Sequence, residues 1–147
     1  MKLNFCINKI LGIGALSLIF TLASHVAKAE VVDVDNDQLQ QLLSKGVPII
    51  DIRLKSEWDE TGVVKGSKLA TFFDERGRYD AAAWLDSVKG FAKKTEPVIV
   101  ICRSGNRTKM VSQFMSQQAG YPTVYNVKYG IQGWMKNGGM VTKPQHP

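Results

Sequence analysis

The chain has 147 residues, of which 44% are hydrophobic and 22% are charged. This composition excludes a disordered protein and a protein made mainly of membrane spans, and the length suits a single domain. The formal charge of +6 would favour a nucleic acid or a membrane surface as partner, and the two cysteines would favour a disulfide. Both interpretations depend on whether the first residues stay in the working protein.

Residues 1–29 have the pattern of a secretory signal peptide. Basic residues precede an uncharged apolar stretch over 10–23, and small residues follow and end with Ala-Lys-Ala at 27–29. We expect export to the periplasm, cleavage after Ala29 and a single domain over 30–147. The alternative is a retained membrane anchor, although the apolar stretch is shorter than the roughly 20 residues that a span needs.

Cleavage changes both the charge and the cysteine count. It removes Lys2, Lys9 and Lys28 and no acidic residue, so the formal charge falls from +6 to +3. The remaining basic residues form no cluster interleaved with aromatic residues, which excludes a nucleic-acid groove, and we expect no stable membrane association after cleavage. Cys6 leaves with the leader. Cys102 is then a lone thiol, either buried and inert or reactive.

Three apolar runs, at 47–52, 97–102 and 123–127, predict β-strands. The second run is apolar on both alternating faces and rich in β-branched residues, which is typical of a strand buried inside a parallel sheet. A fourth candidate strand at 31–34 is short, and we expect it at an edge of the sheet.

Helical patterns lie between these runs. Asp37 is a candidate N-cap for a helix over 38–44, and apolar residues share one face in each of the segments 80–88 and 107–118. Because strands and helices alternate, we predict an α/β fold with a small open, mainly parallel sheet flanked by helices.

The chemistry of the sequence is concentrated at 102–107, which reads Cys-Arg-Ser-Gly-Asn-Arg. Ligands of open α/β sheets bind beyond the carboxyl ends of the strands, and here the cysteine stands at such an end. Gly105 and Asn106 tolerate the left-handed backbone angles that let loop N–H groups converge. The following helix N-terminus and the two arginines add positive charge. We therefore predict a reactive thiolate at Cys102, with an inert buried cysteine as the alternative.

Asp51 and Arg53 stand at the end of the first apolar run, and Glu57 follows. We interpret these residues as a structural ion pair that ties the strand end to the start of a helix. His146 in the tail is the one histidine left after cleavage, which argues strongly against a Cys-His dyad. A single thiol also provides too few ligands for a zinc site.

The chain resembles the rhodanese (sulfurtransferase) family, in particular its exported single-domain members, over about residues 32–139. Three segments carry the resemblance: Asp51-Ile52-Arg53 with Glu57-Trp58 and Gly62, the loop 102–107, and Tyr129-Gly130-Ile131 with Trp134. The chain departs from the family pattern at Gly62-Val63-Val64 and at Tyr129-Gly130. Both departures lie away from the thiol, so they bear on the substrate surface or the choice of partner more than on the sulfur chemistry.

The resemblance implies that Cys102 is catalytic. It would accept the outer sulfur of a small-molecule donor such as thiosulfate as a persulfide, and pass it to cyanide or a thiol, a protein thiol included. The residues that would bind the substrate, through their loop amides, are Arg103, Ser104, Gly105, Asn106 and Arg107. No metal and no organic cofactor is implied.

Two alternatives stay open at this point. The first is a non-enzymatic persulfide carrier or redox-sensing binding module that uses the same thiol. The second is a phosphatase or arsenate reductase. A phosphatase loop has five residues between cysteine and arginine, whereas this chain has Thr108 at the arginine position and Arg107 one residue earlier.

Overall fold

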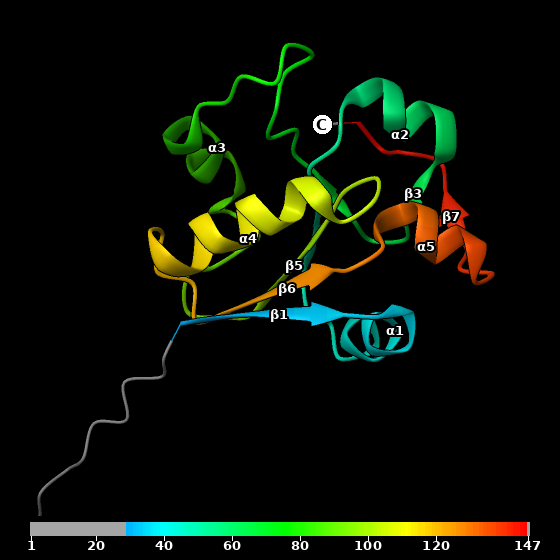
Figure 1. Ribbon diagram of the computed structural model, residues 1–147, viewed down its shortest axis with the longest axis horizontal. Coiled ribbons are helices and arrows are strands. Elements are labelled where there is room, and N and C mark those ends of the chain that lie inside the picture. The colour runs from blue at the N-terminus through cyan, green and yellow to red at the C-terminus, as the bar shows by residue number, and fades with distance from the viewer. Residues whose placement is uncertain (1–28, 147) are drawn as a thin grey trace, which may run out of the picture.

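The computed structural model describes residues 29–146, so the predicted signal peptide lies outside the described residues except for Ala29. Five strands form one sheet in the order β1-β6-β5-β2-β4, and every neighbouring pair in it is parallel (Figure 1). These strands are β1 (Glu30–Val34), β2 (Ile49–Asp51), β4 (Lys68–Leu69), β5 (Val98–Ile101) and β6 (Thr123–Val127). A separate antiparallel pair joins β3 (Val63–Val64) and β7 (Val141–Thr142).

Helices cover both faces of the parallel sheet. The helices are α1 (Asn36–Ser44), α2 (Lys55–Thr61), α3 (Ala81–Val88), α4 (Asn106–Gln117) and α5 (Gly130–Lys136). Side chains of α3 and α4 pack with Val98 and Val100 of β5, whereas side chains of α1 and α5 pack with Ile99 and Ile101. Because neighbouring residues of a strand point to opposite faces, β5 is buried on both sides, as its sequence predicts.

The main elements expected from the sequence are present. β2, β5 and β6 fall within the three predicted apolar runs, and β1 occupies one edge of the sheet. Helices α1, α3 and α4 match the predicted helical segments within one or two residues at either end. The prediction of an α/β fold with a parallel sheet flanked by helices is confirmed.

The predicted N-cap of the first helix is wrong by two residues. Asp35, not Asp37, caps α1: its carboxylate accepts from the N–H of Gln38 at 2.9 Å, and the Gln38 side chain accepts from the N–H of Asp35 at 3.0 Å. This reciprocal pair satisfies two free N–H groups, which a cap at Asp37 would not do. Asp37 lies instead in the first turn, where its negative charge interacts favourably with the positive end of the helix dipole.

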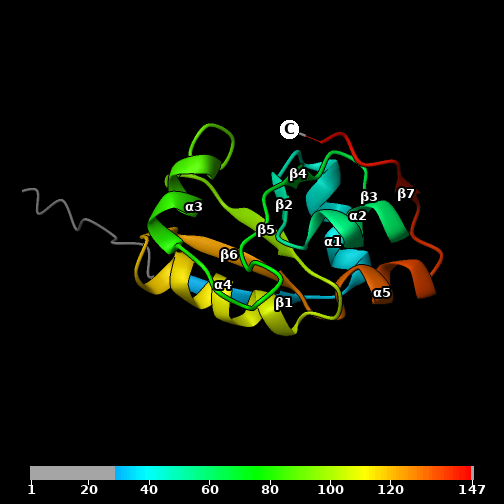
Figure 2. The same cartoon turned by 90° about the horizontal axis from the view of Figure 1, so that it is seen from above.

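The carboxyl ends of the parallel strands meet at one end of the molecule. Figures 1 and 2 show α2, α5 and the β3–β7 pair gathered at this end, around the start of α4. Within residues 29–146, no helix combines the length and the apolar character needed to cross a membrane.

Candidate active site

Cys102 follows directly after β5 and is fully buried, with none of its surface exposed. The neighbouring strand continues beside it, because the N–H of Ile52 donates to the carbonyl of Ile101 at 3.0 Å. The thiol therefore lies at the carboxyl edge of the central strand, where open α/β sheets bind their ligands. The predicted position of the cysteine is confirmed.

Two groups of the following turn contact the sulfur. The N–H of Gly105 donates to Sγ at 3.2 Å, and Oγ1 of Thr108 lies 3.5 Å from the same atom. The Thr108 hydroxyl also donates to the carbonyl of Gly105 at 3.0 Å, which closes the turn on itself. Thr108 had no assigned role in the sequence, although its position in the first turn of a helix after the loop could have indicated it.

The left-handed backbone of the loop belongs to Gly105 alone. Its φ is +87°, and no residue other than glycine has a positive φ among the described residues. The expectation that Asn106 shares this conformation is wrong, because Asn106 is already the first helical residue of α4. Gly105 also packs so closely on the carbonyl of Lys128 that a side chain would not fit.

The start of α5 holds the loop from the opposite side. The N–H groups of Ile131 and Gln132 donate to the carbonyls of Cys102 and Arg103, at 2.8 and 3.1 Å. Gly130 makes this approach possible, since its φ is +57° and a Cβ atom there would lie 2.5 Å from the backbone of Cys102 and Arg103. Two of the first N–H groups of a helix are satisfied in this way.

The two loop arginines have different surroundings. Arg103 and the neighbouring Ser104 are exposed, whereas Arg107 is partly buried and forms a two-bond ion pair with Glu57. Its Nη1 and Nη2 donate to the Glu57 carboxylate at 2.8 and 2.6 Å. The sequence-based view of two arginines beside the sulfur therefore needs correction, because the charge of Arg107 is shared with a carboxylate 50 residues away.

The pKa values of the pair reflect this contact. The hydrogen bonds that Arg107 donates to Glu57 are the main cause that raises the pKa of Arg107. Burial lowers this pKa, and the Cys102 sulfur makes a smaller contribution that raises it. Burial alone would raise the pKa of Glu57. Hydrogen bonds from Arg107 and from the N–H of Leu54 outweigh burial, so the pKa of Glu57 lies below its ordinary value of 4.5.

Asp51 and Arg53 form the predicted structural ion pair. Nη2 of Arg53 lies 2.7 Å from Oδ2 of Asp51, and the two side chains are 1% and 0% exposed. The remaining donors of Arg53 reach the carbonyl of Glu57 at 3.1 Å, Oγ1 of Thr61 at 2.7 Å and the carbonyl of Gly62 at 2.9 Å. Arg53 thus fixes α2 to the end of β2. Glu57 contacts Arg53 only through its backbone carbonyl. The expectation that its side chain belongs to the Asp51–Arg53 ion pair is therefore wrong.

His146 contacts Asp59 rather than the thiol, with Nε2 2.8 Å from Oδ1. Within the part of the chain that the structure describes, no group of three or more His, Cys, Asp or Glu side chains could hold a metal ion. The Cys102 sulfur itself is buried and contacts a backbone N–H and a hydroxyl.

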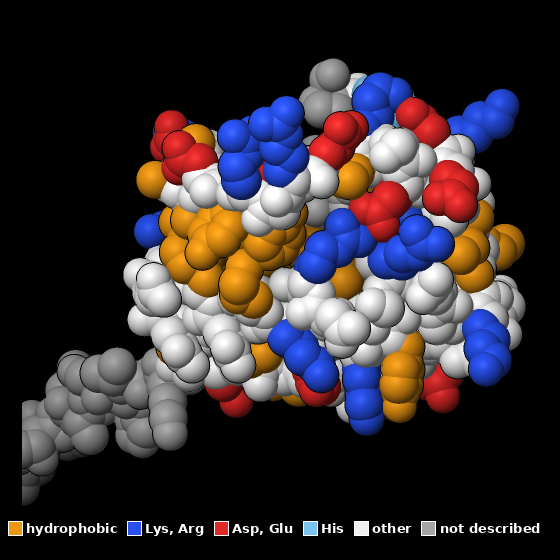
Figure 3. Space-filling view, turned by 45° about the horizontal axis from the view of Figure 1, so that its top comes forward, with side chains coloured by type: hydrophobic (Ala, Val, Ile, Leu, Met, Phe, Trp, Pro, Cys, Tyr) orange, Lys and Arg blue, Asp and Glu red, His pale blue; other side chains and the backbone are white. Residues whose placement is uncertain are grey.

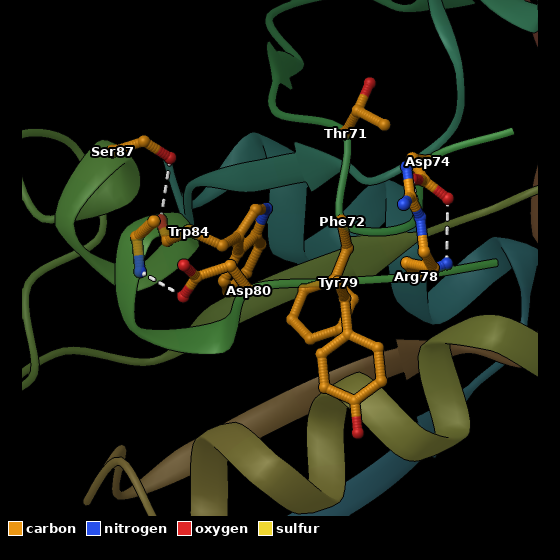
Figure 4. A pocket seen from close by; sticks show the side chains of 9 residues that line it. Thr71, Phe72, Asp74, Arg78, Tyr79, Asp80, Trp84 and Ser87 are labelled. Carbon is orange, nitrogen blue, oxygen red and sulfur yellow. Dashed lines mark hydrogen bonds and ion pairs between the residues drawn. The ribbon is translucent and has the colours of Figure 1, made fainter. Parts of the chain in front are cut away.

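An aromatic cluster lies in the same core as Cys102, beside α3. Phe72 belongs to the same buried cluster as Cys102, and its ring stacks on exposed Tyr79 and meets Trp84 edge-on, with ring centres 5.1 and 5.0 Å apart. A cavity of about 530 Å³ opens on this cluster between the 74–78 turn and α3 (Figure 4). Its lining does not include Cys102 or the loop. Figure 3 shows hydrophobic side chains gathered in a patch beside charged ones.

The fold and the site define an α/β protein with a cysteine-containing loop at the carboxyl edge of a parallel sheet. The family profile of the rhodanese-like domain matches residues 35–137, and the chain belongs to this family.

Two relatives illustrate the similarity in sequence. The chain is 46% identical over 43 residues to thiosulfate sulfurtransferase GlpE of Actinobacillus pleuropneumoniae serotype 3 (strain JL03), a match that covers 29% of this chain and 39% of that protein. It is 28% identical over 125 residues to Protein HIGH ARSENIC CONTENT 1, mitochondrial, of Arabidopsis thaliana, which covers 84% and 72%. The matched region therefore spans well under half of the GlpE relative.

Solved structures show the same fold. Rv0390 from M. tuberculosis has a TM-score of 0.63 at 21% identity, and the likeness covers 78% of this chain and 98% of that one. The polysulfide-sulfur transferase homodimer from Wolinella succinogenes has a TM-score of 0.60 at 22% identity, with 82% and 84% covered. At these identities the likeness establishes the fold.

Proposed function

We propose that the protein is a sulfurtransferase that carries sulfane sulfur as a persulfide on Cys102. The observation that carries this proposal is the setting of the sulfur. It is buried at the carboxyl edge of the sheet, and it accepts a hydrogen bond from the N–H of Gly105 at 3.2 Å. A backbone donor aimed at the sulfur can hydrogen-bond to the negative charge that the sulfur carries during transfer. Membership of the rhodanese-like family supports the same chemistry.

The reaction would consist of two transfers at one sulfur. The Cys102 thiolate attacks the outer sulfur of thiosulfate, the sulfur–sulfur bond of the donor breaks, and sulfite leaves with the electron pair. The product is a Cys102 persulfide anion. In the second step, cyanide or a thiolate attacks the outer sulfur of the persulfide, the bond between the two sulfurs breaks, and the Cys102 thiolate returns.

The loop residues would bind the anions of both steps. Gly105 supplies the N–H that already donates to Sγ, and Thr108 supplies a hydroxyl 3.5 Å away. Arg103, Ser104 and Asn106 are exposed around this point, so their backbone and side chains can meet an arriving donor. The N–H of Gly105 is a fixed donor that needs no rearrangement as charge moves between sulfurs, which lowers the barrier.

The surroundings of Arg107 favour sulfur transfer over phosphoryl transfer. A phosphatase loop uses its arginine as a two-pronged donor to phosphate oxygens. Here both terminal nitrogens of Arg107 donate to Glu57, and Thr108 stands where the phosphatase arginine would be. We therefore rank sulfur transfer above phosphatase or arsenate reductase activity.

We also propose that the protein works in the periplasm after removal of residues 1–29. The support is the sequence alone, namely a basic start, a short apolar stretch and an Ala-Lys-Ala ending. The intact mass of the protein isolated from its native cells tests this proposal. A mass that begins at Glu30 is expected, and a mass that includes the leader would contradict it.

Steady-state transfer from thiosulfate to cyanide tests the proposed function. The protein over 30–147 should form thiocyanate, and Cys102→Ser should form none while unfolding at the same urea concentration. Formation of the persulfide without turnover by cyanide or small thiols would instead favour the non-enzymatic carrier. Hydrolysis of an aryl phosphate that Cys102→Ser abolishes would favour the phosphatase.

A further inference from the structure

We propose that Glu57 sets the charge of the Cys102 loop by holding Arg107 in an ion pair, and that the site thereby favours sulfur donors of low negative charge. The statement about donors rests on the proposed sulfur transfer. The statement about charge rests on the arrangement of Glu57, Arg107 and the thiol. Glu57 acts through Arg107 and is a positioning residue.

Glu57 is itself held firmly. Its Oε2 accepts from the N–H of Leu54 at 3.1 Å as well as from Arg107, and its carbonyl accepts from the buried guanidinium of Arg53. The side chain of Glu57 is 13% exposed. An ion pair between two exposed, flexible side chains contributes little to stability. The pair of Arg107 with Glu57 differs, because its two hydrogen bonds to a fixed, mostly buried carboxylate give it a defined geometry.

Arg107 pairs with this carboxylate at the start of α4, directly after the Cys102 loop. It is the last residue of the loop and lies in the first turn of α4, while Glu57 lies on α2. The Cys102 sulfur is among the groups that stabilise the charged guanidinium, after Glu57 itself. Glu57 uses two of the five N–H donors of the Arg107 guanidinium.

The charge of the loop follows from these contacts. The ion pairs of the described residues include Arg107 with Glu57 but none with Arg103. One of the two loop arginines is thus compensated, and an arriving anion meets one positive charge fewer than the sequence suggests. A dianion such as thiosulfate loses more attraction by this than a singly charged donor does. Glu57 would therefore shift the preference of the site toward monoanionic or neutral sulfane donors.

The charge at the thiol can be measured without any sulfur transfer. Iodoacetate and iodoacetamide alkylate the same sulfur and are similar in size, but only iodoacetate is charged. The ratio of their rates with Cys102 therefore reports the local potential, and the limited access to the sulfur cancels. Glu57→Gln should raise this ratio by about three- to tenfold, because it removes the negative charge that compensates Arg107 of the loop.

Two further variants separate charge from shape. Glu57→Asp keeps the carboxylate and shortens the side chain, so its ratio should stay within about twofold of the unchanged protein. Asp59→Asn makes the same carboxylate-to-amide change on the same helix, where Asp59 pairs with Lys55 at the surface, and it should leave the ratio unchanged. A ratio unaffected by Glu57→Gln, or shifted equally by Glu57→Asp, would overturn the proposal.

The preference for donors is tested with thiosulfate and methanethiosulfonate. Both give up a sulfane sulfur to a thiolate, and they release sulfite and methanesulfinate respectively, but they differ by one negative charge. Glu57→Gln should lower KM for thiosulfate by about three- to tenfold relative to KM for methanethiosulfonate, with kcat changed less. An equal change for both donors would overturn the donor preference.

The two proposals fail in different ways. If neither donor transfers sulfur while the alkylation ratio shifts in Glu57→Gln, the proposed function and the donor preference are wrong, and the control of charge by Glu57 stands. If both donors transfer sulfur while the ratio and KM do not respond, the proposed function stands and the role of Glu57 is wrong.

Discussion

Gly130→Ala should damage the site because it forces α5 away from the Cys102 loop. The new Cβ would lie 2.5 Å from the carbonyl oxygens of Cys102 and Arg103. Carbon and oxygen atoms in contact are normally separated by about 3.5 Å, so loop and helix must part by about 1 Å. This movement weakens the hydrogen bonds from the N–H groups of Ile131 and Gln132 to the loop.

The expected loss in the free energy of unfolding has two parts. Gly130 has a φ of +57°, and an alanine in this region costs about 1–2 kcal/mol. The overlap with the loop backbone adds about 1–3 kcal/mol, as overpacking does elsewhere. Gly138 is the matched control, since its φ is +77° and no atom lies within 4 Å of its Cβ position. Gly138→Ala should therefore lose only the first part.

Urea unfolding of both variants and their sulfur-transfer rates provide the assay. We expect Gly130→Ala to lose roughly 2–5 kcal/mol in the free energy of unfolding. Its kcat/KM should fall by about 10- to 100-fold, because a shift of 1 Å at the site disturbs the reacting geometry. Gly138→Ala should keep its kcat/KM. Equal losses of stability and activity in the two variants would refute the role assigned to the contact between α5 and the loop.

Three further predictions concern the groups around the site. Arg53→Met should lower the free energy of unfolding by about 3–5 kcal/mol, because it leaves the Asp51 carboxylate buried without its partner; adding Asp51→Asn should recover part of this loss in urea unfolding, and a further loss would contradict the account. The pKa of Glu57 lies below its ordinary value of 4.5, so its ion pair stabilises the fold fully above pH 4.5 and ceases to do so as the pH falls through the lowered pKa. The difference in unfolding free energy between the unchanged protein and Glu57→Gln should accordingly shrink on acidification, and a difference that grows would be inconsistent with this sign. Thr108→Val removes a hydroxyl 3.5 Å from the sulfur at nearly constant volume, and it should slow alkylation of Cys102 by iodoacetamide by about three- to tenfold; an unchanged rate would show that the hydroxyl does not act on the sulfur.

Strong local patterns made most of the fold predictable. The buried strands are continuous apolar runs, and α1, α3 and α4 have apolar faces with helical spacing. Helix α2 lacks such a signal, since its sequence KSEWDET is mostly polar, and it is fixed by the buried guanidinium of Arg53. Helix α5 contains two glycines, which disfavour a helix, and its first turn is stabilised by the carbonyls of the Cys102 loop. Contacts of this kind join distant residues and leave no local pattern.

The part of the site that is local in the sequence was also predictable. The cysteine, the glycine turn and the helix start are consecutive in the chain, so their arrangement follows from local rules. The contact between Glu57 and Arg107 spans 50 residues. The spacing of Glu57 four residues after Arg53 suggests a local pair instead, but Asp51 already occupies the Arg53 guanidinium. The carboxylate of Glu57 instead accepts from the loop arginine at the start of α4, a residue distant in the sequence.

The mass of the protein after exposure to thiosulfate tests the central claim most directly. The protein is first reduced, freed of reductant and treated with thiosulfate, and its intact mass and peptide masses are then measured. A persulfide adds one sulfur atom, about 32 Da, to the peptide that contains Cys102, and subsequent cyanide should remove it. Cys102→Ser should gain no mass. An unmodified Cys102 peptide in the folded protein, or the same gain in Cys102→Ser, would contradict transfer through this thiol.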